Sequence, residues 1–175
     1  ERGYQDRDEY RILALYNPAQ PWQPWQPQPQ WNRKVLVTHG GNCGTSFTPG
    51  SAKLNDFSGT FDDVPVVEQS YVTGLGLGFA VMSTALNNGG HNCDVVLQAE
   101  SMVMAKERIV EQYGPIRYTL GTGCSGGSIT QTTVANAYPG IYQGLITMCA
   151  YPDSMSAGVQ FTDSHLMRKY FESPD

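Results

Sequence analysis

Short apolar runs recur along the chain, separated by segments rich in glycine, proline and asparagine. Runs of this length with such borders are typical of buried strands, because helices of a globular domain need about ten residues or more. The pattern predicts strands over residues 11–16, 33–38, 78–83, 116–121 and 144–149.

Other segments have apolar residues at helical spacing. One apolar face is formed by Met102, Ala105, Ile109 and Tyr113. Charged residues lie between them, and Gly114-Pro115 ends the helix. Further helices are predicted over 126–137 and 166–171. Because strands alternate with helices, we expect an α/β fold with a mainly parallel sheet and helices on both faces.

Segment 17–31 is dominated by proline, glutamine and tryptophan. Four prolines recur every third residue, so in polyproline II geometry they would share one edge, with Trp22 and Trp25 on another. A functional interpretation is a ligand for a proline-binding module, or an aromatic lip over a substrate cleft. We favour a stiff surface connection whose indoles pack on the body.

The composition indicates one globular domain, or part of one, with 175 residues, 40% hydrophobic and 15% charged. The net charge of −5, without a block of lysine or arginine, excludes nucleic acid as a partner. No apolar run reaches the roughly 20 residues that cross a membrane, so we expect no membrane association. Four cysteines without a CxxC pair favour disulfides over a metal site, and hence a secreted or periplasmic protein.

The strongest chemical signal is Gly123-Cys124-Ser125-Gly126-Gly127, which fits G-x-S-x-G between a predicted strand and a predicted helix. Both outer glycines are needed because a serine on so sharp a turn leaves no room for neighbouring side chains. This motif predicts that Ser125 is a catalytic nucleophile. A phosphate-binding loop is disfavoured because no lysine follows the glycines.

Acyl transfer also needs backbone donors for the oxyanion. The amide of Gly126 is the first candidate, because it directly follows the nucleophile. The second is Gly41 or Asn42, because the loop His39-Gly40-Gly41-Asn42 follows a predicted strand.

The catalytic base is not evident among the three histidines. His39 belongs to the oxyanion loop, and His91 precedes the serine in a glycine-rich turn. His165 follows Ser125, with Asp153 between them, which gives a formal Ser, Asp, His order. Only one clear strand separates the serine from this region, so we disfavour His165 and Asp153 as base and acid, and expect His165 on a helix that packs on or covers the site.

The cysteines allow three pairings. Cys43 and Cys93 each follow an asparagine in loops that should be neighbours at the carboxyl edge of the sheet. We therefore expect them to form a disulfide that braces the rim of the site.

The chain has specific motifs at residues 86–93, 99–101, 106–108, 121–128 and 135–144. Through these motifs it resembles the DUF6351 family of bacterial α/β-hydrolase-like proteins, over residues 22–171. The resemblance implies an α/β-hydrolase-like fold. That family is longer than this chain, which supports the expectation that residues 1–175 are the N-terminal half of one incomplete domain.

More distantly, Gly123-Cys124-Ser125 with Gly127, and Tyr138-Pro139, resemble the tannase and feruloyl esterase family. There, a cysteine beside the nucleophile is bridged to one beside the catalytic histidine. This likeness would give Cys124 a partner outside the chain, although no His-Cys pair occurs here.

We therefore expect a serine hydrolase that cleaves small-molecule or polymeric carboxylic esters through an acyl-enzyme on Ser125. The acid and histidine would come from a missing C-terminal segment or from a second polypeptide. One alternative is an amidase or peptidase matured into two chains, and another is a non-catalytic binding protein. The chemistry calls for no cofactor.

Overall fold

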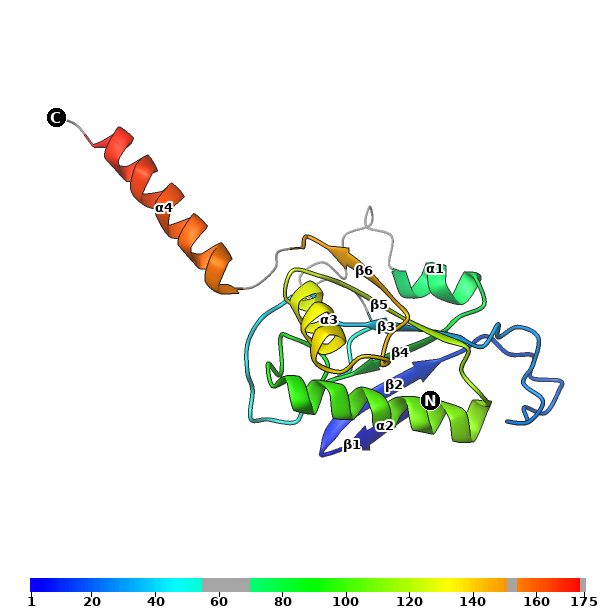
Figure 1. Cartoon of the computed structure of the whole chain (residues 1–175). Coiled ribbons are helices and arrows are strands. Elements are labelled where there is room, and N and C mark those ends of the chain that lie inside the picture. Colours follow the sequence, from blue (N-terminus) through cyan, green and yellow to red (C-terminus); the bar gives the residue numbers. More distant parts are fainter. Residues whose placement is uncertain (55–69, 151–153, 174–175) are drawn as a thin grey trace.

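The computed structural model describes residues 1–54, 70–150 and 154–173, and within them the chain forms a mixed α/β structure around one sheet (Figure 1). The six strands of that sheet lie in the order β1-β2-β4-β3-β5-β6. Their bounds are Arg2–Gln5 (β1), Asp8–Leu13 (β2), Lys34–Thr38 (β3), Ala80–Thr84 (β4), Tyr118–Cys124 (β5) and Gly144–Met148 (β6).

The last four strands of this order are parallel, while β1 and β2 are antiparallel to their neighbours. The register pairs Val37 of β3 with Met82 of β4 and with Gly121 of β5. The carboxyl ends of these strands therefore meet at one edge, where ligand sites of parallel sheets usually lie.

Helices cover both faces of the sheet, as the alternation of elements predicts. They are α1 (Ser70–Gly76), α2 (Val95–Tyr113) and α3 (Gly126–Ala137). Val35 and Val37 of β3 belong to the core formed with α2 and α3, whereas Leu36 between them faces α1, where it approaches Gly74. Successive residues of a strand point to opposite faces, so α1 lies on the face opposite α2 and α3.

Strand β1 and helix α1 have no counterpart among the elements predicted from the sequence. Strand β2 was expected at 11–16 but begins at Asp8, and it buries Glu9, which accepts hydrogen bonds from Arg11 (2.9 Å) and from the Ala52 amide (2.7 Å). Because Glu9 is charged, it interrupts the apolar pattern from which a buried strand is predicted. Helix α1 is short and contains two glycines, which are poor helix formers.

The proline-rich segment is a surface connection, as expected, but of the two indoles expected to pack on the body Trp22 does so and Trp25 does not. Trp22 packs on Tyr113 (ring centroids 5.5 Å apart) and donates through its indole N–H to the Tyr113 carbonyl (2.9 Å). Trp25 is 78% exposed, so the two indoles do not share an environment. A turn in which the Gln26 amide donates to the Gln23 carbonyl interrupts any continuous polyproline helix.

Helix α4 (Ser154–Glu172) projects away from the sheet (Figure 1). The expectation that the helix carrying His165 packs on or covers the site is therefore wrong. Nearly all of its described side chains are exposed, including Phe161 and Tyr170 at 78% and 76%. No helix in the described ranges is both long and apolar enough to cross a bilayer.

Candidate functional site

Ser125 stands at the turn between β5 and α3, where the sequence predicts it. Its backbone has φ 54° and ψ −113°, a conformation rarely adopted by a residue with a side chain. A Cβ at Gly123 would lie 3.1 Å from the Gly127 backbone, so the two glycines allow the strand and the helix to approach at this turn. Ser125 is half-buried, and its hydroxyl makes no hydrogen bond with the described part of the chain.

The strained backbone at Ser125 costs free energy, so the surrounding contacts must hold the turn in place. The Ser125 amide donates to the Met148 carbonyl of β6 (3.1 Å), and its carbonyl accepts from the Ser128 amide (2.9 Å) and hydroxyl (2.7 Å). Ser125 is thereby tied to β6 and to the first turn of α3. Its hydroxyl is presented at a helix N-terminus, where backbone amides favour negative charge.

The loop after β3 lies directly against this turn. A Cβ on Gly126 would overlap the Asn42 carbonyl oxygen, and one on Gly127 would overlap the Gly40 carbonyl oxygen. The sequence predicts that these two segments lie together, and in the structure they are in contact. Here the loop presents carbonyls to the helix, and the Gly126 amide donates to the Gly41 carbonyl (3.3 Å). The first expected oxyanion donor is therefore occupied within the described structure.

The loop after β4 supports the loop after β3. Gly40 has a positive φ of 66°, and a Cβ there would approach the Asn88 side chain to 2.8 Å. The Gly44 amide donates to the Gly89 carbonyl (2.8 Å). A cavity of about 260 Å³ lies beside these loops and is lined by Gly41, Asn42 and His91, among others. Sequence reasoning missed the supporting role of residues 87–91.

His39 is fully buried under the turn and serves as a structural residue. Its Nδ1 lies 3.2 Å from the Asn87 carbonyl, which can only accept, so Nδ1 carries the proton and Nε2 accepts from the Tyr142 hydroxyl (2.8 Å). Burial lowers the pKa of His39 to about 4, against the opposing effect of the Asn87 hydrogen bond. A neutral ring with both nitrogens occupied cannot take a proton from Ser125.

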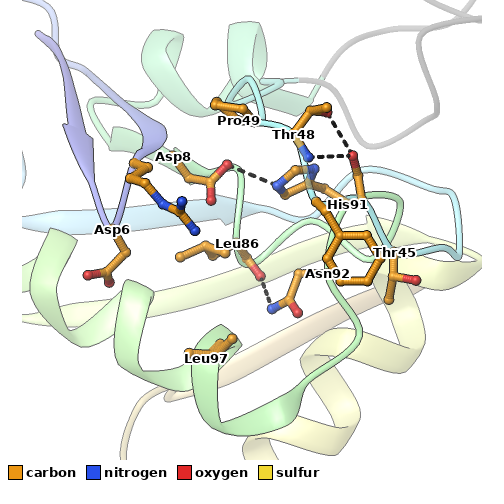
Figure 2. A pocket seen from close by; sticks show the side chains of 12 residues that line it. Asp6, Asp8, Thr45, Thr48, Pro49, Leu86, His91, Asn92 and Leu97 are labelled. Carbon is orange, nitrogen blue, oxygen red and sulfur yellow. Dashed lines mark hydrogen bonds and ion pairs between the residues drawn. The ribbon is translucent and has the colours of Figure 1, made fainter.

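Neither of the other two histidines makes a hydrogen bond with Ser125 in the described residues. His91 pairs through Nε2 with Asp8 Oδ1 at 2.9 Å (Figure 2). His165 lies on the exposed helix α4. Asp153 falls outside the described residues. The described structure therefore assembles a serine turn without a histidine base beside it.

The cysteine pairing differs from both expectations. Cys124 is bonded to Cys149, with their Cα atoms 5.0 Å apart, so the partner of Cys124 lies within the chain. Cys43 and Cys93 are both exposed and do not bridge. Their loops do meet, as expected, but the Cys93 thiol is directed to the Gly44 carbonyl (3.1 Å). Neighbouring loops bring two cysteines close without fixing the direction of their Cβ–Sγ bonds.

Comparison with known proteins identifies a family for this chain. No curated protein matches this chain. A family model matches it from residue 1 to residue 175, and the chain belongs to that family, the tannase-like family of unknown function (DUF6351).

Proposed function

We propose that this chain carries the nucleophile of an α/β-hydrolase-type serine hydrolase that cleaves carboxylic esters. The observation that supports this most is the strained backbone of Ser125 at the β5–α3 turn, with its half-buried hydroxyl making no hydrogen bond with the described residues. Strain of this kind is kept at functional sites, and a strand–serine–helix turn is the setting that acyl transfer uses. Membership of a tannase-like family agrees with an esterase.

In the proposed reaction, the Ser125 hydroxyl oxygen attacks the ester carbonyl carbon as its proton passes to a base. The tetrahedral intermediate then expels the alcohol, which takes up the proton, and leaves an acyl-enzyme on Ser125. Water, deprotonated by the same base, releases the acid and restores the serine.

The proposed reaction needs two features that the described structure does not provide: free oxyanion donors and a catalytic base with its acid. The Gly126 amide donates to the Gly41 carbonyl, so that loop must shift before Gly126 and either Gly41 or Asn42 can bind an oxyanion. The histidine and acid would lie on a further C-terminal segment or a second chain that completes the domain. The Cys124–Cys149 disulfide fits an exported protein, and we propose secretion or a periplasmic location.

The proposal is tested by labelling the full-length protein with a fluorophosphonate, which reacts with activated serines. We expect the label on the peptide carrying Ser125, and loss of both labelling and ester turnover in Ser125→Ala. The control is Thr133→Ala, which removes an exposed hydroxyl from the same helix and keeps every contact of Ser125. Turnover that persists in Ser125→Ala would refute the nucleophile assignment.

A non-catalytic binding protein is the second candidate, because the Gly126 amide is occupied by Gly41. This alternative predicts neither labelling nor turnover in the complete protein. An amidase or peptidase would label like an esterase, so paired ester and amide substrates with the same acyl group must separate those two.

A further inference from the structure

A cavity of about 740 Å³ opens beside the N-terminal hairpin (Figure 2). Its walls come from the β1–β2 turn, residues 45–49, the loop after β4 and the start of α2. None of the residues that line it belongs to β5 or α3, so it is distinct from the serine turn. This volume is typical of small-molecule sites.

The β1–β2 turn contributes charged side chains at the cost of backbone strain. Asp6 and Arg7 form the two-residue turn and both have positive φ, 50° and 68°. Glycine is strongly favoured at the second position of such a turn, yet the chain has arginine there. Neither side chain makes a hydrogen bond or ion pair with the residues described, and both line the cavity. They are available to a ligand.

The cavity also contains an oriented histidine. Nε2 of His91 donates to Asp8, which accepts from the Gly50 amide as well, and both side chains are largely buried. In the neutral ring, Nδ1 is then an acceptor, and no partner for it occurs within the described ranges. The carboxylate fixes the tautomer and the orientation of the imidazole.

The remaining lining is partly apolar, with Leu86, Leu97 and the fully exposed Phe47. A lining that offers donors and acceptors beside apolar surface matches a ring that bears several hydroxyl groups, which both donate and accept. Two carboxylates, Asp6 and Asp8, and one guanidinium, Arg7, line the cavity, which disfavours an anion. No group of three metal-binding side chains is found in the described segments.

We propose that this cavity binds a neutral polyhydroxylated ring, such as a sugar, independently of Ser125. The carboxylate of Asp6 and the guanidinium of Arg7 would bind neighbouring hydroxyls, His91 Nδ1 would accept from another, and the apolar side chains would contact the ring carbons.

The test is saturation-transfer NMR on the full-length protein with glucose, galactose, xylose and arabinose as probes. We expect at least one sugar to receive saturation at its ring protons, and Arg7→Gly to weaken its Kd about tenfold or more, because a charge-assisted hydrogen bond is lost. The melting temperature of Arg7→Gly should not fall, since glycine relieves the strained φ.

Arg33→Gly is the matched control, because Arg33 is also an exposed arginine with positive φ (65°) and does not line the cavity. It should bind the sugar like the wild type. Ser125→Ala should also bind it unchanged, so the result does not depend on the proposed esterase. Absence of binding by all four sugars, or equal weakening in both arginine variants, would overturn the proposal.

Discussion

Gly126 illustrates how closely the serine turn is packed at the scale of single residues. A methyl group there would overlap the Asn42 carbonyl and approach the Cys43 Sγ to 2.7 Å. Since the overlapping atom is backbone, Gly126→Ala should destabilise the protein by about 3 kcal/mol or more. Urea unfolding measures this difference.

The control is Gly76→Ala in α1, where a Cβ would meet nothing within 4 Å. Because alanine is the better helix former, we expect that variant to be neutral or stabilised by up to about 1 kcal/mol. Equal stabilities for the two variants would contradict the packing of the loop after β3 on the serine turn.

His39 makes stability depend on pH. Burial lowers its pKa to about 4 from the usual 6.5, so the unfolded chain binds a proton more readily than the native protein. The native state is therefore fully favoured above pH 6.5, and loses up to about 3 kcal/mol as pH falls from 6.5 to 4.

His39→Gln removes this titration. The variant should be less stable than the wild type at pH 8, and the difference should shrink as the pH falls to 4. Urea unfolding at several pH values measures both curves. Parallel curves across this window would show that His39 is not buried in its neutral form.

The disulfide acts at the scale of elements, since it joins the end of β5 to the residue after β6. The two cysteines are 25 residues apart, a separation for which a cross-link stabilises by about 3 kcal/mol. Cys124→Ala/Cys149→Ala should lose about that much in urea unfolding. Cys43→Ser/Cys93→Ser should stay close to the wild type, and peptide mapping without reductant should recover the 124–149 pair. Recovery of a disulfide-linked 43–93 peptide would show that Cys43 and Cys93 do bridge, against the structure.

At the scale of the whole molecule, His165 is the remaining rival for the base of the proposed reaction, because it alone among the histidines follows Ser125. It lies on α4, which projects from the sheet. In the full-length protein, His165→Ala should therefore keep the proposed esterase activity within about twofold, because exposed substitutions usually change stability by about 0.5 kcal/mol or less. Ser125→Ala should lose nearly all of it. An equal loss in the two variants, with the fold intact, would make His165 part of the catalytic unit.

Local patterns in the sequence were sufficient to predict the strands of the parallel core and the position of the serine turn. The strands around Val35, Val81 and Leu120, and the helix over 126–137, follow from apolar runs and glycine borders, because their contacts repeat with the period of the element. The position of Ser125 follows from two glycines at fixed spacing, since steric exclusion at a sharp turn is a local property.

Only the tertiary structure decided the features that depend on contacts distant in sequence. It pairs Cys124 with Cys149, and it buries Glu9 where polarity predicts exposure, because Ala52 and Arg11 supply its hydrogen bonds. It also joins Asp8 to His91 across 83 positions of the chain and turns the Gly41 carbonyl toward Gly126. Side-chain direction and backbone hydrogen bonding between loops have no sequence period, so residue pattern alone could not determine them.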